Sequence, residues 1–266
     1  MSSAIPYLDV NWPVTTGCLP DFPCWQRCWA RAMDHRFAHV GNVVGTFKPT
    51  FHAGRLAQPL HWRKPRRVGV AFTGDLFVDG ITDEQIAAVF GVMAACPQHT
   101  FYVITKRAER MAAWFARDVD WPAECGEAAS SALGEGGFTA IAYLPLAWPL
   151  PNVVLLVSVS TEPEAEERIK WLLRCPAAVH GVSAEPLLGP IDFGRLRYHL
   201  TRPGTEGVNW VVAAAESGPR ARPLNLDWVR KIRDDCAENG CAFSFKNQTG
   251  YPPLDGVVHN ALPGRP

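Results

Sequence analysis

The sequence lacks a long apolar run, a net charge and a leader pattern. No stretch approaches the roughly 18 consecutive apolar residues that a membrane span requires. The 26 lysines and arginines equal the 26 aspartates and glutamates, so no overall basic field favours nucleic acid, although local patches are compatible with it. The first ten residues lack the charged-then-apolar order of a signal peptide. We therefore expect a protein without a membrane segment that is not secreted.

Composition excludes disorder. The chain has 266 residues, of which 47% are hydrophobic and 20% charged, as in ordinary globular proteins. A chain of this length buries about three quarters of its unfolded surface as one domain, so residues 1–266 are predicted to form a single domain. Without a leader, the eight cysteines are expected to be reduced. Five of them are scattered and are interpreted as packing residues, namely Cys96, Cys125, Cys175, Cys236 and Cys241.

The other three cysteines lie close together in residues 16–30, here called the cysteine loop. Cys18, Cys24 and Cys28 have the spacing C-x5-C-x3-C. Three soft thiolates on one short segment suit an iron–sulfur cluster or zinc, and three protein ligands leave one metal position open. Asp21 and Pro23 predict a helix over 23–39, with two cysteines one turn apart near its positive end, where thiolate is favoured. The first cysteine would fold back from the preceding loop.

Short apolar runs alternate with helical patterns along most of the chain. Buried strands are predicted at 68–73, 101–105, 153–159, 177–183, 210–215 and 242–246, with a doubtful early strand within 11–17. Helices are predicted at 81–96, with Thr82 as its cap, and at 107–117, 162–174 and 225–239. This order predicts an α/β protein built as a partial (β/α) barrel of about six parallel strands. A doubly wound open sheet is the alternative, but no Gly-rich dinucleotide fingerprint supports it.

Three segments depart from this repeat. Residues 119–152 are rich in Ala, Gly and Pro without periodicity, and are interpreted as an irregular insertion that is either an active-site lid or a mobile segment. Residues 187–209 are a second long connection. Residues 250–266 are a Pro- and Gly-rich tail.

Polar residues follow each predicted strand. In parallel α/β folds, ligands bind at the carboxyl ends of the strands, so we expect a polar mouth there. Any one of these residues could instead cap a helix or lie on a solvated face. The basic run 63–67 precedes a strand and is therefore expected at the opposite end. The candidates at the mouth are Thr73, Gly74, Asp75, Lys106, Arg107, Ser158, Ser160, Glu185, Glu216, Ser217, Arg220, Arg222 and Lys246.

Several motifs together resemble a known family. They are TGC…C…C, KPRRVGVAFTGDLF, HTFYVITKRAERM, PNVVLLVSVSTEPEAEERIKWLL, SAEPLLGP, ESGPRARPLNLDWVRKIRDDC and SFKNQTG, in order from about residue 9 to 250. The chain resembles the phage-associated radical-SAM-like proteins, which also occur in bacterial genomes. Some phage members are implicated in thymidine hypermodification, as isomerases that convert an N-linked glycyl-thymidine into the Cα-linked form.

This sequence departs from that family at three points. The middle cysteine is shifted by one position, which gives C-x5-C-x3-C while the outer pair keeps the family separation. Arg27 replaces the aromatic residue often found before the last cysteine. The GGE-like motif is represented at best by Thr73-Gly74-Asp75. Neither of the first two departures removes a ligand, but both bear on the geometry expected of a cluster.

The resemblance implies a cofactor, a substrate and a setting. Cys18, Cys24 and Cys28 would hold a [4Fe-4S] cluster whose fourth iron chelates S-adenosylmethionine (SAM), the source of a 5′-deoxyadenosyl radical. It further implies DNA carrying modified thymidine as substrate, an electron donor such as flavodoxin, and the cytoplasm of an infected bacterial host. The SAM-binding candidates are Thr73, Gly74, Asp75, Ser158, Ser160, Glu185 and Glu216. The substrate-binding candidates are Lys106, Arg107, Ser217, Arg220, Arg222 and Lys246.

Two other functions fit the same residues. One is a different radical SAM reaction on nucleic acid, such as base-lesion repair or RNA modification. The other is not an enzyme but a nucleic-acid-binding protein stapled by zinc through the three cysteines of the loop.

Overall fold

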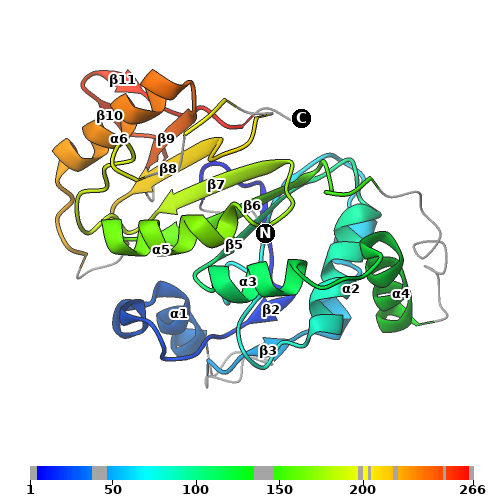
Figure 1. The fold of residues 1–266 in the computed structure, drawn as a ribbon. Coiled ribbons are helices and arrows are strands. Elements are labelled where there is room, and N and C mark those ends of the chain that lie inside the picture. Colours follow the sequence, from blue (N-terminus) through cyan, green and yellow to red (C-terminus); the bar gives the residue numbers. More distant parts are fainter. Residues whose placement is uncertain are drawn as a thin grey trace.

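A curled sheet of seven parallel strands forms a half-barrel in the computed structural model (Figure 1). The structure describes residues 5–37, 47–134, 147–196, 200–202, 205–217, 221–247 and 250–263. The strands, in spatial order, are β1 (Val10–Trp12), β4 (Arg67–Val70), β5 (Thr100–Thr105), β6 (Val153–Val159), β7 (Val179–Ala184), β8 (Trp210–Ala214) and β9 (Ala242–Lys246). The predicted partial barrel is confirmed. The doubtful early strand is β1, which pairs in parallel with β4 at the sheet edge.

Both faces of the sheet are buried, as the continuous apolar runs predict. Every residue of β6 is buried. One face carries the main core beneath the helices α2 (Asp83–Ala94), α3 (Ala108–Phe115), α5 (Glu162–Leu172) and α6 (Leu226–Asn239). The other face carries a smaller cluster in which Tyr7 packs against Tyr102 and Trp210, with ring centroids 5.6 and 5.1 Å away. This inner cluster is built from residues in the first and middle parts of the strands, whereas polar side chains follow at their carboxyl ends.

Helix α2 begins where the sequence predicts it. The Thr82 side chain accepts a hydrogen bond from the Gln85 N–H, and the Gln85 side chain accepts one from the Thr82 N–H. This reciprocal capping box satisfies two donors that the first turn would otherwise leave without partners. The predicted bounds of the other three helices agree with the structure within two residues at each end.

The predicted irregular insertion is wrong over its first half. Helix α4 (Trp121–Leu133) begins at the cap Asp120 and packs against α2. The two helices approach so closely that a Cβ on Gly91 would lie 2.1 Å from the Cys125 carbonyl oxygen. Small residues gave α4 a weak apolar pattern, because they bury little side chain while allowing close backbone contact. Residues 135–146 lie outside the described part of the chain.

The predicted helix over 23–39 is also wrong, because it is divided at Cys28. A 3₁₀ helix, η1 (Pro23–Arg27), is followed by α1 (Trp29–Phe37). Cys28 between them is extended, with φ −65° and ψ 117°. The two cysteines therefore do not share one helical face. Tertiary packing overrides the helical pattern here, since the Trp25 ring in η1 packs against Phe47 at 5.6 Å.

The remaining elements are small. Strands β2 (Thr15–Thr16) and β3 (Thr50–Phe51) form an antiparallel pair, and so do β10 (Pro253–Leu254) and β11 (Val257–Val258) in the tail. Short 3₁₀ helices η2 (Ala53–Arg55) and η3 (Gln58–His61) precede β4. None of the helices in the described ranges is long and apolar enough to cross a membrane. The five scattered cysteines are buried, which confirms their interpretation as packing residues.

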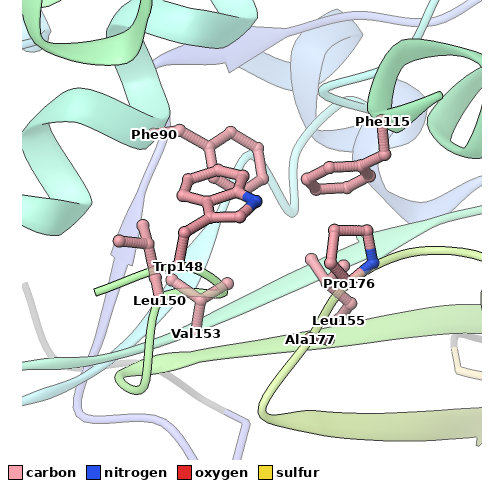
Figure 2. Close-up of a pocket in the computed structure, with 8 residues that line it drawn as sticks. All are labelled: Phe90, Phe115, Trp148, Leu150, Val153, Leu155, Pro176 and Ala177. Atoms are coloured by element: carbon pink, nitrogen blue, oxygen red, sulfur yellow. The ribbon is translucent and has the colours of Figure 1, made fainter. Parts of the chain in front are cut away.

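A small apolar cavity lies at the amino ends of the strands (Figure 2). It is a shallow, partly open hollow between Phe90 of α2, Phe115 of α3 and Trp148, next to Val153 at the start of β6. Its walls offer neither a charged side chain nor a thiol. The chemistry-bearing residues are at the other end of the sheet.

Candidate functional site

A chain of polar contacts crosses the mouth from β5 to β9. The Lys106 ammonium donates to the Ser158 hydroxyl, which donates to the Glu185 carbonyl at 3.3 Å. The Lys246 ammonium donates to the Glu185 carboxylate at 2.6 Å. Lys246 and Ser158 are buried, so these charged and polar groups are largely removed from water. The structure thus brings four of the predicted site residues together on the inner face of the half-barrel.

Among the residues that the structure describes, two hydroxyl groups at the mouth have no hydrogen-bond partner. Ser183 pairs in register with Ser158 on the neighbouring strand, is 1% exposed, and its hydroxyl makes no hydrogen bond. The Thr73 hydroxyl beyond β4 is also buried without a partner. A buried polar group without a hydrogen bond costs about 1–3 kcal/mol, so both are suited to bind a polar group of a ligand. Ser183 lies at a polar strand end in the sequence, and that position is the signal by which it could have been found.

Asp75 is surrounded by donors from the protein itself. Its carboxylate accepts from the Thr105 hydroxyl at 2.8 Å, the Phe77 N–H at 2.9 Å and the Lys106 N–H at 3.2 Å. Arg107 adds an ion pair at 3.1 Å. The predicted cofactor-binding carboxylate therefore forms part of a buried framework between β4 and β5.

The end of β4 also holds the start of the cysteine loop. The Gly17 N–H donates to the Thr73 carbonyl at 3.1 Å. A Cβ on Gly74 would lie 2.8 Å from the Gly17 carbonyl oxygen, so glycine is needed at position 74 for close packing. Of the predicted Thr73-Gly74-Asp75 motif, the Thr73 hydroxyl is the group that finds no partner within the described ranges.

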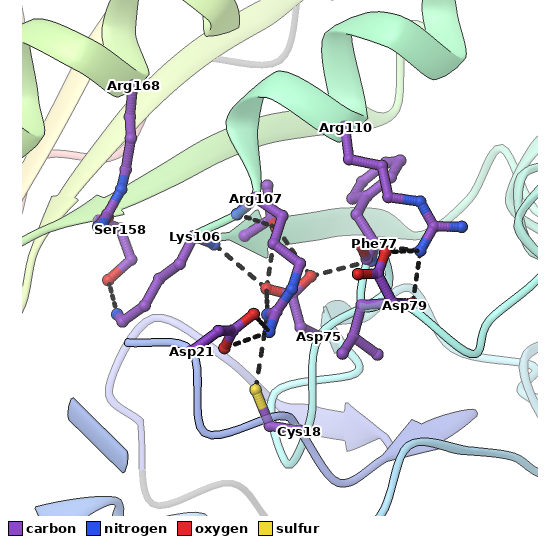
Figure 3. A network of polar contacts seen from close by, with 12 residues as sticks. Cys18, Asp21, Asp75, Phe77, Asp79, Lys106, Arg107, Arg110, Ser158 and Arg168 are labelled. Atoms are coloured by element: carbon purple, nitrogen blue, oxygen red, sulfur yellow. Dashed lines mark hydrogen bonds and ion pairs between the residues drawn. The ribbon is translucent and has the colours of Figure 1, made fainter. Parts of the chain in front are cut away.

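Arg107 connects the cysteine loop to this framework (Figure 3). Its guanidinium donates to Asp75 at 3.1 Å, to Asp21 at 2.6 and 2.8 Å, and to the Cys18 sulfur at 3.5 Å. The side chain is 7% exposed. Arg107, predicted to bind substrate, is thus in contact with a candidate metal ligand.

The three thiols of the cysteine loop are half-buried, and the cysteines, all of which lie in the described ranges, are free of disulfides. Burial raises the pKa of Cys18, and the nearby Arg107 charge opposes that rise. Burial also raises the pKa of Cys24, opposed by Lys106. The expectation that a helix end favours thiolate is wrong for Cys24, because burial dominates and this residue lies in a short 3₁₀ turn.

The thiols do not converge in this arrangement. Within the described ranges, no three histidine, cysteine, aspartate or glutamate side chains lie close enough to hold a metal ion. The donor set nevertheless fits an iron–sulfur cluster by its chemistry, since it offers three thiols and cationic neighbours that favour thiolate. Binding would have to draw the thiols of Cys18, Cys24 and Cys28 together.

Glu216 lies at the end of β8 and faces two arginines. It accepts hydrogen bonds from the Arg222 side chain at 2.7 and 2.9 Å, and Arg27 of the cysteine loop lies 3.9 Å away. The hydrogen bonds from the Arg222 side chain lower the pKa of Glu216 to about 2. Ser217 beside it is half-buried. Arg220 lies outside the described residues.

Sequence reasoning missed one buried arginine at the mouth. Arg168 of α5 is 5% exposed and donates to the Ser158 carbonyl at 2.5 Å and to Glu164 at 3.1 Å. Glu164 also accepts from the Ser160 N–H at 2.6 Å. The Glu164/Arg168 pair at i,i+4 in the helix after a strand is the sequence signal that was available.

Phe22 of the cysteine loop packs beneath two of these cations. The Arg107 and Arg168 guanidinium carbons lie 5.2 and 5.1 Å from its ring centroid. Both contacts are within the range of cation–π attraction.

The basic run before β4 lies at the opposite end, as predicted, with Arg67 paired to Asp9 at 2.9 Å.

The fold and site define an α/β half-barrel protein with a cysteine-bearing mouth at the carboxyl ends of its strands. The chain belongs to the DUF5131 family, described as "Protein of unknown function", whose profile matches residues 2–262. No curated protein and no solved structure matches the chain.

Proposed function

We propose that this protein is a radical SAM enzyme that acts on modified thymidine in DNA. One observation carries the proposal: three thiols on one short loop lie at the carboxyl-end mouth of a half-barrel, and the first contacts a buried arginine. The motif resemblance from about residue 9 to 250 supports the same conclusion.

Each part of the mouth has a role in this proposal. Cys18, Cys24 and Cys28 would hold a [4Fe-4S] cluster with one iron left for SAM. Together these groups would supply the one-electron chemistry needed to abstract a hydrogen atom from a substrate. The unpartnered Ser183 and Thr73 hydroxyls offer hydrogen bonds to a bound polar group. The residues of the inner face would exclude water around the reacting atoms.

Charged residues of the mouth suit SAM and an anionic substrate. Glu216 has a pKa of about 2 and is ionised at neutral pH, so it can accept hydrogen bonds from the ribose hydroxyls or the amino group of SAM. The carboxylate of Glu185 is a second acceptor for the same ligand. The cations Lys106, Lys246 and Arg222 can attract phosphate or carboxylate groups, although the whole chain is neutral.

The particular reaction that we propose is isomerisation of N-linked glycyl-thymidine to the Cα-linked form. The support is the resemblance to phage proteins of thymidine hypermodification. An electron donor such as flavodoxin and the cytoplasm of an infected bacterial host complete the proposed setting.

The cofactor is tested by anaerobic reconstitution of the full chain with iron and sulfide. We expect about four irons and four sulfides per chain in the wild type. Cys18→Ala, Cys24→Ala and Cys28→Ala should each lose the cluster, whereas the control Cys241→Ala removes a thiol outside the mouth and should keep it. A colourless protein that retains zinc instead would establish the zinc-stapled alternative.

The reaction is tested with DNA that carries N-linked glycyl-thymidine. After incubation with SAM and dithionite, the DNA is digested and its nucleosides are separated by liquid chromatography and mass spectrometry. Isomerisation predicts a product of unchanged mass and altered retention. A change in mass would indicate another radical SAM modification, and unchanged DNA from a protein that holds the cluster would refute this substrate.

A further inference from the structure

Arg107 is the point where the cysteine loop meets the sheet. It is the residue that precedes α3, directly beyond the end of β5. Its guanidinium contacts Asp75 on the sheet side and Asp21 and Cys18 on the loop side, while its carbon lies over Phe22. One buried side chain therefore touches three residues of the loop.

The framework holds Arg107 in one orientation. The Arg107 N–H donates to the Thr105 hydroxyl at 2.8 Å, and the same hydroxyl donates to Asp75 at 2.8 and 2.9 Å. Asp75 is itself fixed by two backbone donors, those of Phe77 and Lys106. A planar guanidinium has several donors in a rigid fork, which a lysine ammonium cannot reproduce. The fork reaches two carboxylates and one sulfur at the same time.

We propose that Arg107 is a positioning residue that fastens residues 18–22 to the strand ends and so holds Cys18 in place before a cofactor binds. The role of Arg107 in holding Cys18 for a cofactor rests on the proposed function, whereas the fastening of the loop does not. Arg107 thus acts on the loop rather than on the substrate. The neighbouring residue Lys106 contacts Ser158. Of the two side chains, it is therefore the one that lies on the inner face of the half-barrel.

The contacts of the loop predict which change loosens it. Asp21→Asn removes the charge of an exposed loop residue and leaves the buried Arg107–Asp75 pair intact. Arg107→Lys keeps a charge beside Asp75 but loses the fork. Arg110→Lys is the matched control, because Arg110 lies one turn further along α3 and donates to the carbonyls of Phe77, Val78 and Ile81 rather than to the cysteine loop.

The first test is hydrogen–deuterium exchange on the full chain without iron or SAM. In Arg107→Lys and Asp21→Asn we expect exchange to accelerate about tenfold in peptides covering 18–22. This factor corresponds to the loss of one charge-assisted hydrogen bond. Exchange in α2 and β6 should be unchanged, and Arg110→Lys should leave the cysteine loop as in the wild type. Unchanged exchange at 18–22, or faster exchange across the whole chain, would overturn the proposal.

The second test is the iron retained after reconstitution and desalting. We expect both loop variants to retain less iron than the wild type and Arg110→Lys. Equal retention would overturn the role of Arg107 in holding Cys18 for a cofactor. If the wild type itself binds no iron, the proposed function fails, and the exchange measurement alone still decides whether Arg107 fastens the loop.

Discussion

The two halves of the cysteine loop are held in different ways. Residues 17–22 are attached to the sheet and its neighbours by the backbone bond from Gly17 to Thr73, by the bond from the Cys18 N–H to Phe47, and by Arg107. In η1, by contrast, no residue is fully buried. Its link to the far side of the mouth is Arg27, 3.9 Å from Glu216.

The difference indicates which half would move when the three thiols are drawn together. The buried Arg107 side chain and backbone bonds fix Cys18, whereas Cys24 lies in a short 3₁₀ turn and Cys28 in an extended linker. Short 3₁₀ segments have poorer hydrogen-bond geometry than α-helices and rearrange more easily. We therefore expect Cys24 and Cys28 to approach Cys18, and the following predictions test this contrast in order of decreasing effect.

Arg107→Met should have the largest effect on stability. It leaves the Asp75 carboxylate buried without its cation, which costs about 3–5 kcal/mol in the free energy of unfolding. Urea denaturation followed by tryptophan fluorescence measures the loss. The double variant Asp75→Asn/Arg107→Met removes the stranded charge and should be more stable than Arg107→Met alone. A double variant as unstable as the sum of the two single losses would show that Asp75 and Arg107 do not interact.

Gly17→Ala should have the second largest effect on stability. Gly17 has φ +82°, and an added Cβ would lie 2.0 Å from the Lys48 carbonyl oxygen. Backbone strain and overpacking together should cost roughly 2–4 kcal/mol in the free energy of unfolding. Gly54→Ala is the control, since nothing lies within 4 Å of its added Cβ and its stability should match the wild type. Equal stability of the two variants would mean that the start of the loop is not tightly packed.

Glu216→Gln should have a smaller and pH-dependent effect. The folded-state pKa of Glu216, about 2, lies below its ordinary value of 4.5. Its ionised form therefore stabilises the fold above about pH 4.5, and this contribution is lost as the pH falls toward 2. Denaturation at pH 6 and pH 3 should show Glu216→Gln less stable than the wild type by about 1.5 kcal/mol at pH 6, with a smaller difference at pH 3. A pH-independent difference would contradict the depressed pKa.

Arg27→Ala should have the smallest effect. Arg27 is half-exposed and its ion pair to Glu216 is long, so the free energy of unfolding should fall by less than about 0.5 kcal/mol. Urea denaturation of the variant and the wild type measures this difference in the free energy of unfolding. A loss as large as that of Gly17→Ala would show that the second half of the loop is anchored as firmly as the first.

Much of the fold could be predicted from the sequence, because its signals are local. Continuous apolar runs such as Val153–Val159 indicate strands buried on both faces, and the Thr82/Gln85 pair indicates a helix start. Helix α4 was missed because its small residues pack by close backbone approach, which leaves no strong apolar period. The break at Cys28 was missed because it depends on long-range contacts such as that of Trp25 with Phe47.

The site could be predicted as a set of strand ends but not as a network. Parallel strands end at one edge, so Ser158, Glu185 and Lys246 could be placed together without coordinates. Which side chains pair cannot be read from order along the chain. Arg107 and Arg168 turn inward to partners 86 and 10 residues away, and such choices depend on packing that a single sequence does not record.

The proposed chemistry is tested most directly by the formation of 5′-deoxyadenosine. The reconstituted full chain is incubated anaerobically with SAM and dithionite, and the nucleoside is quantified by liquid chromatography. We predict 5′-deoxyadenosine from the wild type and from Cys241→Ala, and none from Cys18→Ala, Cys24→Ala or Cys28→Ala. A wild-type protein that holds its cluster and yields no 5′-deoxyadenosine with or without modified DNA would contradict the proposal that this half-barrel is a radical SAM enzyme.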